Sequence, residues 1–389
     1  MSKDFITRKQ EIYSRYEKLI GRSNIVVYPG NGVYERYQYP ALSSDHIPPH
    51  WMYDLNPNTN PHLMIRQGIN TVFNAGAIKL DGKYLMVPRI EGFNVKSFFG
   101  VAESDNGIDR WRFWDKPIHL PSAGDPETNV YDMRLTQHED GWIYGLFCAE
   151  RKDHSMPDDS SAAIASCGIA RSKDLREWER LPDLKSNAQQ QRNCVLHPEF
   201  VNGKYMIYTR PQSGFIETGD SGISVGFTID MTSPVINEEL LVDPRTYHTV
   251  KEVKNGQGPA PLKTDLGWLH LGHAVRRTAA GLRYVLYLFL TDIHEPWKII
   301  RRPEGHFIEP MGNERVGDVS NVIFSNGWIM EPDGRVFIYY ASSDTRMHVA
   351  ITELNRLLDY LMNTPEDPGK TEACLINRLD LINKNQGYY

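Results

Sequence analysis

The amino-acid sequence predicts an all-β protein, a five-bladed β-propeller with added N-terminal and C-terminal helices. Three observations lead to this fold class. Short runs of alternating hydrophobic and polar residues, separated by Gly, Pro and Asp, fill most of the 389 residues. A turn glycine followed by such a run recurs five times at similar intervals. Amphipathic helical patterns lie near the two ends of the chain.

The first element is a helix within residues 4 to 21. Its apolar residues Ile12, Tyr16, Leu19 and Ile20 stand at helical spacing between charged positions, which predicts one apolar stripe. We therefore expect residues 1–22 to form a helical extension and residues 23–389 to form a single propeller domain. Either the same chain or another subunit must cover the stripe. The second alternative predicts a homo-oligomer assembled through this helix.

Five turn glycines mark the repeat, and the intervals between them are 59, 62, 64 and 67 residues. Four of them follow Asp or Asn, and Asp-Gly and Asn-Gly favour hairpin turns because they tolerate positive φ. A β-unit of this length repeated five times predicts five antiparallel blades. Two β-sandwich domains would not impose a fivefold period. The glycines are Gly82, Gly141, Gly203, Gly267 and Gly334.

A second repeat supports the blades. Gly100-Val-Ala-Glu-Ser-Asp105 resembles Gly168-Ile-Ala-Arg-Ser-Lys-Asp174, and each is followed by a tryptophan, Trp111 or Trp178. These segments are expected to be outer strands of successive blades.

The last patterned element spans Val349 to Leu361, where leucines stand at helical spacing. This spacing predicts a C-terminal helix that packs against the rim of the propeller.

Charge and hydropathy exclude several classes of partner. The net charge is −6 and no dense run of Lys or Arg occurs, so we expect no nucleic acid. The N-terminus has no stretch resembling a signal peptide, and the longest apolar run, Tyr284 to Leu290, is too short to span a bilayer. We therefore expect no membrane partner and a cytoplasmic location.

Metal and redox chemistry are not indicated either. Cys148, Cys167, Cys194 and Cys374 form no Cys-x-x-Cys pair, and we expect them to be reduced and buried. His270 and His273 would point to opposite faces of a strand, which disfavours a shared metal ion. No nucleotide-binding glycine motif is present.

The stretch from Asn129 to Leu135 contains the best candidate for a functional acid. In a regular strand, alternation puts Asp132 and Arg134 on one face. A carboxylate buried on the inner face of a strand is costly unless it is paired. Asp132 is therefore either half of a structural ion pair with Arg134 or an acid with a catalytic task.

The repeat brings cationic residues together. Arg89 and Arg210 follow their turn glycines by seven residues, and His273 follows its own by six. If the five strands after these glycines surround the axis with one polarity, these side chains meet at one mouth of the central tunnel. Two arginines and a histidine at one mouth predict an anion site.

One acid beside a cationic cluster suits phosphorolysis better than hydrolysis. An inverting glycosidase needs a second carboxylate to activate water. Phosphate is already an anionic nucleophile and needs a cationic binding site instead.

An ordered set of motifs resembles the β-mannoside phosphorylases of glycoside hydrolase family 130. The resemblance runs from Asn74 to Asp344 and implies a five-bladed propeller. The motifs are Tyr131-Asp-Met-Arg134, Gln191-Arg-Asn-Cys-Val-Leu-His-Pro198, Gly203-Lys-Tyr, Arg210-Pro, Lys254 with Gly256-Gln-Gly-Pro-Ala-Pro-Leu-Lys-Thr264, Gly267-Trp-Leu, His273 and Tyr339-Tyr-Ala-Ser-Ser-Asp344.

The Tyr-Asp-Met-Arg form is similar to the subgroup that acts on 4-O-β-D-mannosyl-D-glucose. The resemblance thus implies inverting phosphorolysis of that sugar to α-D-mannose 1-phosphate and D-glucose, with inorganic phosphate as co-substrate and no metal or organic cofactor. It implies that Asp132 is the general acid, acting through the mannose 3-hydroxyl. The implied phosphate ligands are Arg192, Asn193, Arg210, Lys254, His273 and Tyr284, and the implied sugar ligands are Asn74, Arg89, Tyr131 and Asp344.

Two other readings stay open. The first is a phosphorylase for β-1,4-mannooligosaccharides, or a β-mannoside hydrolase, on the same fold. The second is a non-catalytic propeller that binds glycans.

Overall fold

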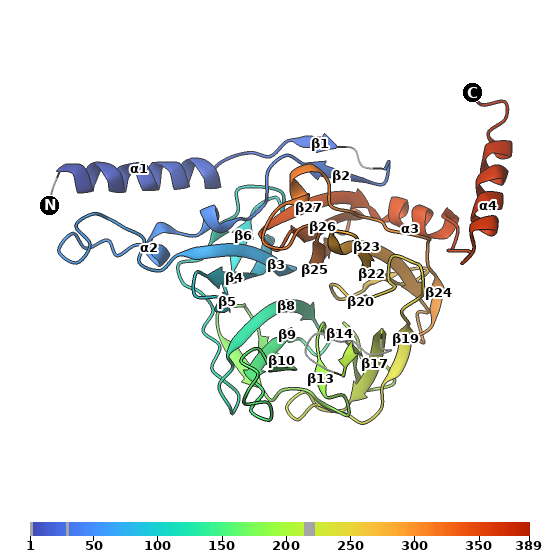
Figure 1. The fold of residues 1–389 in the computed structure, drawn as a ribbon, viewed down its shortest axis with the longest axis horizontal. Coiled ribbons are helices and arrows are strands. Elements are labelled where there is room, and N and C mark those ends of the chain that lie inside the picture. The colour runs from blue at the N-terminus through green and yellow to red at the C-terminus, as the bar shows by residue number, and fades with distance from the viewer. Residues whose placement is uncertain (1–2, 29–30, 214–221) are drawn as a thin grey trace.

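Five antiparallel sheets surround a central axis (Figure 1). This computed structural model describes residues 3–28, 31–213 and 222–389. The predicted five-bladed propeller with helices at both ends is confirmed. The division into units 1–22 and 23–389 stays a prediction.

The blades follow one another along the chain, and we number them I to V. Blade I contains β3 (Ile69–Leu80), β4 (Lys83–Gly92), β6 (Ala102–Ser104) and β7 (Arg112–Phe113), with β5 (Ser97–Phe99) beside β4. Blade II contains β8 (Asn129–Gln137), β9 (Ile143–Lys152), β10 (Ala163–Ser172) and β11 (Trp178–Leu181). Blade III contains β14 (Val195–Leu196), β15 (Tyr205–Thr209), β17 (Ile223–Thr228) and β19 (Leu240–Asp243).

The last two blades contain five strands each. In blade IV, β20 (Lys254–Gln257) and β21 (Leu262–Thr264) both pair with β22 (Gly267–Thr278), which is followed by β23 (Gly281–Thr291) and β24 (Ile299–Arg301). Blade V contains β25 (Ile323–Met330), β26 (Arg335–Ser342), β27 (Arg346–Glu353), β2 (Tyr34–Tyr37) and β1 (Val26–Tyr28). Two small pairs lie between blades: β12 (Lys185–Ser186) with β18 (Val235–Ile236), and β13 (Gln190–Gln191) with β16 (Pro211–Gln212).

Blade V closes the ring with strands from both ends of the chain. The N-terminal strand β2 pairs with β27, so that Tyr34 lies opposite Thr352. This pairing connects the N-terminal part of the chain to the last blade.

The five repeat glycines all adopt positive φ, between 73° and 138°. Each lies at the turn between the first and second strands of its blade, so the predicted hairpin turns are confirmed. The strand after each glycine is, however, the second of its blade and does not line the axis. The innermost strands are those before the glycines, and β3 contacts β8 on one side and β25 on the other. The prediction of the hairpins was therefore correct, but the prediction that the strands after the glycines line the axis was wrong. A turn glycine marks a hairpin without indicating which of its two strands lies nearer the axis.

The second repeat is confirmed as the outer part of blades I and II. The repeated segments contain β6 and the end of β10, which are the third strands of their blades. Trp111 directly precedes the outermost strand β7, and Trp178 begins β11.

The N-terminal helix α1 (Lys3–Ile20) packs partly on its own chain. Phe5 and Ile20 are buried, and the helix contacts the short helices η1 (Ser44–His46) and α2 (Pro49–Met52). The stripe residues Ile12 and Tyr16 are only half-buried. The same chain therefore covers part of the predicted stripe.

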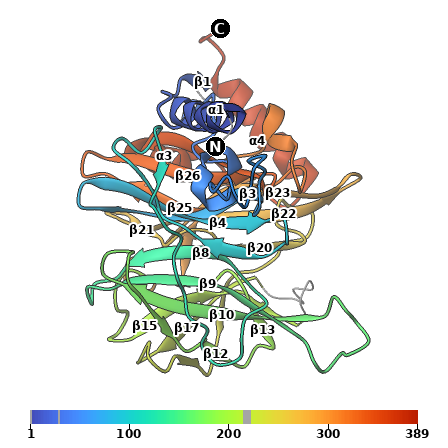
Figure 2. The same ribbon diagram turned by 90° about the vertical axis from the view of Figure 1, so that its left-hand side faces the viewer.

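The C-terminal helix is shorter than predicted. Residues from Val349 to Glu353 belong to β27, where their alternating side chains pair with β26, and α3 (Leu354–Asn363) begins after them. Leu357 and Leu361 of α3 are buried against the sheet of blade V. A further helix, α4 (Thr371–Lys384), was not predicted and has no buried residue. Figures 1 and 2 show α1 and α4 on the same side of the propeller.

The described cysteines are all free thiols. Cys148, Cys167 and Cys194 are buried, as predicted, but Cys374 lies on α4 and is exposed. Among the residues that the structure describes, no helix is long and apolar enough to cross a membrane.

Candidate active site

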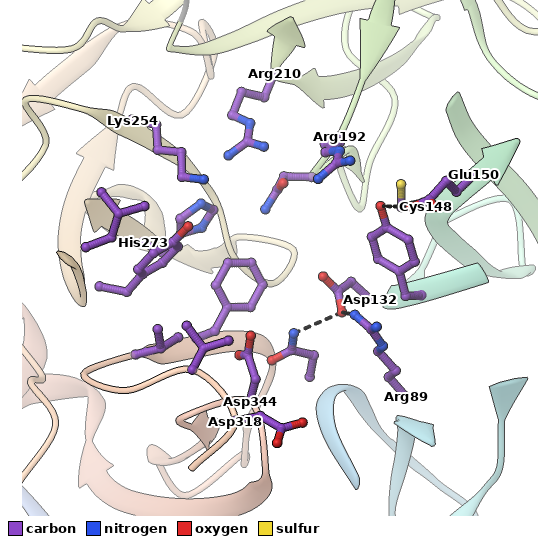
Figure 3. A pocket seen from close by; sticks show the side chains of 18 of the residues that line it. Arg89, Asp132, Cys148, Glu150, Arg192, Arg210, Lys254, His273, Asp318 and Asp344 are labelled. Carbon is purple, nitrogen blue, oxygen red and sulfur yellow. Dashed lines mark hydrogen bonds and ion pairs between the residues drawn. The ribbon is translucent and has the colours of Figure 1, made fainter. Parts of the chain in front are cut away.

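One cavity of about 670 Å³ is lined by residues from all five blades. All eleven residues predicted to bind or react lie around it, and Figure 3 shows many of their side chains pointing into it. They are Asn74, Arg89, Tyr131, Asp132, Arg192, Asn193, Arg210, Lys254, His273, Tyr284 and Asp344.

A β-bulge orients Asp132. Tyr131 pairs with Cys148 and Arg134 pairs with Leu146, so two residues of β8 oppose one residue of β9. Asp132 therefore leaves the regular alternation, and its φ is 61°. Arg134 donates to the backbone oxygen of Asp132 at 2.8 Å rather than to its carboxylate. The strand is thus not regular at this point, and the carboxylate faces the cavity (Figure 3).

The carboxylate of Asp132 has two neighbours from blade I. The side-chain amide of Asn74 donates to its Oδ1 at 2.9 Å. The Arg89 Nη1 atom lies 3.8 Å from the same oxygen. Arg89 itself is held by Ser97 Oγ at 2.9 Å and by Glu91 at 2.6 Å. Asp132 is therefore oriented by an amide, with a guanidinium close by.

Four of the predicted site residues adopt left-handed backbone conformations. The φ angles are 47° at Asn74, 61° at Asp132, 55° at Asn193 and 50° at Asp344. Asn and Asp are the non-glycine residues that tolerate this region best. Backbone strain of this kind collects at functional sites, where the surrounding structure holds it in place.

Tyr131 separates two of the cationic groups. The Arg89 guanidinium lies 4.8 Å from the centre of its ring and that of Arg192 lies 5.8 Å away. The Tyr131 hydroxyl donates to Glu150 Oε2 at 2.9 Å, and burial raises its pKa further above neutrality. Tyr131 is therefore a protonated phenol with a fixed orientation.

Blades III and IV provide a cationic wall, which we define as Arg192, Arg210, Lys254 and the neighbouring His273. Burial, followed by the charge of Arg192, lowers the pKa of Arg210 to about 10. Burial, followed by the charges of Arg210 and Arg192, lowers the pKa of Lys254 to about 8. Lys254 forms no salt bridge with any residue in the described ranges. Like charges held together under burial favour the binding of an anion.

His273 contributes a neutral ring and no positive charge. Burial, followed by the charges of Arg210, Arg134 and Lys254, lowers its pKa well below the ordinary value. The sequence-based view of two arginines and a histidine as three cations is therefore corrected at this residue. Within the described chain, neither ring nitrogen has a hydrogen-bond partner. A neutral imidazole still donates one N–H.

A glycine makes room for the His273 ring. Gly256 on β20 pairs with His273 on β22, and a Cβ at residue 256 would lie 2.3 Å from His273 Cε1. Tyr284 lies on the other side, with its ring centre 6.4 Å from that of His273 and 5.2 Å from Lys254 Nζ. The imidazole is thus packed in one orientation.

Blade II, blade V and the loop before β25 provide an acidic wall, which we define as Asp132, Asp318 and Asp344. Burial, followed by the charge of Asp132, raises the pKa of Asp344 to about 7. Asp318 Oδ2 accepts a hydrogen bond from Asn70 at 2.9 Å. Carboxylates of this kind accept hydrogen bonds from sugar hydroxyl groups.

Several lining residues were not predicted as site residues. Five of them come from irregular segments, the β22–β23 turn and the loop before β25, for which the repeat carries no signal, and the others lie in strands. They are Asn129, Arg134, Cys148, Glu150, Ala280, Gly281, Leu282, Asp318, Val319, Ser320, Val322 and Phe324.

The arrangement opposes one oriented acid to a cationic wall across a single cavity. Such a site can hold an anionic nucleophile against a neutral sugar whose leaving oxygen needs a proton. In the described part of the chain, no group of three or more His, Cys, Asp or Glu residues could hold a metal ion.

A family model described as beta-1,4-mannooligosaccharide phosphorylase matches residues 53–363. The chain belongs to glycoside hydrolase family 130. Within this family, it is 57% identical over 384 residues to a 4-O-beta-D-mannosyl-D-glucose phosphorylase of Bacteroides fragilis, and the alignment covers 98% of each chain. It is 28% identical to a beta-1,4-mannooligosaccharide phosphorylase of Ruminococcus albus, over 83% of this chain and 92% of that one.

A solved structure agrees in fold. The beta-1,2-mannobiose phosphorylase of Listeria innocua, in complex with beta-1,2-mannobiose, superimposes with a TM-score of 0.65 at 20% identity. The match covers 76% of this chain and 93% of that one. The family resemblance stated from the sequence motifs is therefore confirmed.

Proposed function

We propose that the protein catalyses inverting phosphorolysis of 4-O-β-D-mannosyl-D-glucose, giving α-D-mannose 1-phosphate and D-glucose. The observation that carries this proposal is the cationic wall facing the oriented carboxylate of Asp132 across one cavity. Glu150, Asp318 and Asp344 also line the cavity, but a hydrolase would have no use for the buried cations, which suit an anionic nucleophile. The name of the B. fragilis relative, at 57% identity over nearly the whole chain, supports the choice of substrate.

Asp132 is the proposed general acid. In its protonated form it gives a proton to the mannosyl 3-hydroxyl, and that hydroxyl passes its own proton to the glycosidic oxygen. The bond between the anomeric carbon and this oxygen breaks, and a phosphate oxygen forms a new bond to the carbon from the opposite face. Glucose leaves with the proton, and the configuration at the anomeric carbon is inverted.

Arg192, Asn193, Arg210, Lys254, His273 and Tyr284 are the proposed phosphate ligands. The two arginines can each offer a planar pair of donors to phosphate oxygens, whereas Lys254 offers a point charge. His273 acts as a neutral donor because of its lowered pKa. Tyr284, whose pKa is raised to about 12 by burial, keeps its hydroxyl proton to donate.

Asn74, Arg89, Tyr131 and Asp344 are the proposed ligands of the disaccharide. Asn74 Oδ1 is buried and has no partner in the described chain, which leaves it available to a sugar hydroxyl. Tyr131 lies beside the proposed glucosyl position.

We further propose that the reaction needs neither a metal nor an organic cofactor and that it occurs in the cytoplasm. Phosphate supplies the nucleophile, and the cationic wall supplies the charge that a metal would otherwise provide. The buried free thiols suit a reducing compartment. Undiminished turnover after treatment with EDTA would support metal independence, and lost turnover restored by a divalent cation would contradict it.

Product analysis tests the reaction. The purified protein is incubated with 4-O-β-D-mannosyl-D-glucose with and without phosphate. We expect α-mannose 1-phosphate and glucose only when phosphate is present. Free mannose without phosphate would mean a hydrolase. Faster phosphorolysis of β-1,4-mannooligosaccharides would favour the substrate named in the family model, and sugar binding without turnover would favour a binding protein.

The oligomeric state is a separate proposal. The half-buried stripe of α1 and the apolar residues exposed on α4, such as Leu375 and Ile376, support a homo-oligomer in which α1 takes part. Light scattering on the full chain and on a variant lacking residues 1–21 tests this. An equal number of subunits in the two would contradict a role for α1.

A further inference from the structure

A fully buried amide lies directly behind the candidate active site. Asn326 is 0% exposed and sits in β25 where the pairing with β26 shifts register between Phe324 and Gly327. Its Nδ2 donates to the backbone oxygen of Asn74 at 3.1 Å. Asn326 is not among the residues that line the cavity. It therefore reaches the site only through another residue.

Asn74 carries the connection to the acid. It also lies at a register shift, between Phe73 and Gly76 of β3, and its φ is 47°. Its Nδ2 donates to Asp132 Oδ1 at 2.9 Å. Two successive amide hydrogen bonds thus connect blade V to blade I and blade I to the proposed acid on blade II.

Glycines after these bulges bring the three innermost strands into close contact. A Cβ at Gly327 would lie 2.5 Å from the backbone nitrogen of Ala77, and a Cβ at Gly76 would lie 2.7 Å from the backbone oxygen of Met133. Real Cβ atoms cannot approach that closely, so only glycine allows the strands to touch here. The short reach of an asparagine side chain is then enough to cross each junction.

We propose that Asn326 is a positioning residue for Asp132, acting through Asn74. A left-handed residue other than glycine is strained and needs outside support. The side-chain amide of Asn326 supplies this support because it holds the backbone carbonyl of Asn74 in place. The side-chain amide of Asn74 is then directed toward the Asp132 carboxylate. Without this support, Asn74 relaxes, and the Asp132 carboxylate turns toward Arg89 Nη1, 3.8 Å away. This inference rests on the proposed function of Asp132.

The neighbouring residue offers a matched control. Ser325 is also 0% exposed and lies in the same bulge, but its hydroxyl donates to the backbone oxygen of Tyr339 at 2.8 Å, within its own blade. Asn326→Ala and Ser325→Ala each remove one buried hydrogen bond from β25. If Asn326 has a purely structural role, both variants should have lower melting temperatures than the wild type and the same kcat as each other.

The positioning role predicts a difference between the two variants. Asn326→Ala should lower kcat for phosphorolysis about 10- to 100-fold, with little change in the KM for phosphate, because a small misplacement of a reacting group has effects of this size. Ser325→Ala should keep the wild-type kcat. Equal kcat values in the two variants would overturn the inference.

A double-mutant cycle tests the route. Asn74→Gly removes the middle amide while keeping a residue that accepts positive φ. In that background, Asn326→Ala should have almost no further effect on kcat. If the two losses of kcat multiply instead, Asn326 does not act through Asn74.

A crystal structure of Asn326→Ala separates this inference from the proposed function. We expect the distance from Asn74 Nδ2 to Asp132 Oδ1 to exceed hydrogen-bonding range. An unchanged distance would overturn the positioning role whether or not the protein turns over the disaccharide. An inactive wild-type protein would instead contradict the proposed function and leave this structural test in force.

Discussion

The two walls of the cavity differ in how their charged side chains are held. On the acidic wall, Asp132 and Asp318 each accept a hydrogen bond from an asparagine side chain. On the cationic wall, burial and the charge of Arg192 lower the pKa of Arg210, and burial and the charges of Arg210 and Arg192 lower the pKa of Lys254. The acidic wall comes from blade II, blade V and the loop before β25, and the cationic wall comes from blades III and IV.

The acidic wall therefore orients a reacting group, whereas the cationic wall binds an anion. Hydrogen bonds from rigid neighbours aim a carboxylate, which suits an acid that must meet one hydroxyl. Buried cations that repel one another destabilise the free protein and bind an anion more strongly for that reason. Substitutions on the two walls should therefore act on different kinetic constants, and the loss of a cation from the cationic wall should stabilise the free protein.

The largest effect is expected on the acidic wall. Asp132→Asn should lower turnover by at least about 1,000-fold in both directions, because it removes the proton donor. Asparagine tolerates the positive φ of this position, so the melting temperature should stay near that of the wild type. The rate at which α-mannose 1-phosphate forms measures turnover, and calorimetry measures the melting temperature. Turnover close to the wild-type rate would remove Asp132 from the mechanism.

The next effect is expected on the cationic wall. Arg210→Met should raise the KM for phosphate about 10- to 100-fold, since a charged hydrogen-bond donor to the anion is lost. The melting temperature should rise, because a buried charge near other cations is removed. Steady-state kinetics with phosphate varied, together with thermal unfolding, measure both.

Arg180→Met is the matched control for Arg210→Met. Arg180 is equally buried but forms ion pairs with Glu127 and Asp183, away from the cavity. Its loss leaves carboxylates without their partner, so the melting temperature should fall while the KM for phosphate stays unchanged. If both variants shift the melting temperature in the same direction, the proposed destabilising effect of the cationic wall is wrong.

A third prediction concerns the pH dependence of stability. The pKa of Asp344 is raised from 3.8 to about 7, so its protonated form favours folding. The wild type should lose stability as pH rises from about 4 to 7, because the folded protein must then ionise a buried carboxyl. Asp344→Asn should lack this loss and be more stable at pH 8 by on the order of 2 kcal/mol. Urea unfolding at about pH 5 and pH 8 tests it; parallel wild-type and variant curves would contradict the raised pKa.

The smallest effect concerns Lys254. Its pKa of about 8 means that it loses its charge as pH rises through that value, so the KM for phosphate should increase about 5-fold between about pH 7.5 and 9.5. The stability of the free protein should rise over the same interval, since the lysine is no longer charged while buried. Lys254→Arg should flatten the KM profile because arginine stays charged. An equally steep rise in that variant would assign the titration to another group.

The repeat predicted three of the eleven site residues, the strand pattern predicted Asp132, and the family resemblance supplied the other seven. Arg89, Arg210 and His273 occupy nearly equivalent positions in three blades, and equivalent positions converge in a ring of like units. Asn193 and Tyr284 were identified only through the family resemblance, because nothing in their local pattern sets them apart. Asp318 and Glu150 were missed. Asp318 lies in a loop without a periodic pattern. Glu150 lies near the end of β9, and only the packing of the neighbouring strands places this end beside the cavity.

The sequence by itself determined the fold class, the number of blades and the set of charged residues at one mouth. Turn glycines and alternating runs are local signals, and they repeat once in every blade. Only the tertiary structure decided which of these side chains carry a charge and in which direction the Asp132 carboxylate points. Burial among other cations makes His273 neutral, and the bulge in β8 turns Asp132 away from Arg134 and toward Asn74. Both depend on contacts between blades, which a single strand pattern does not encode.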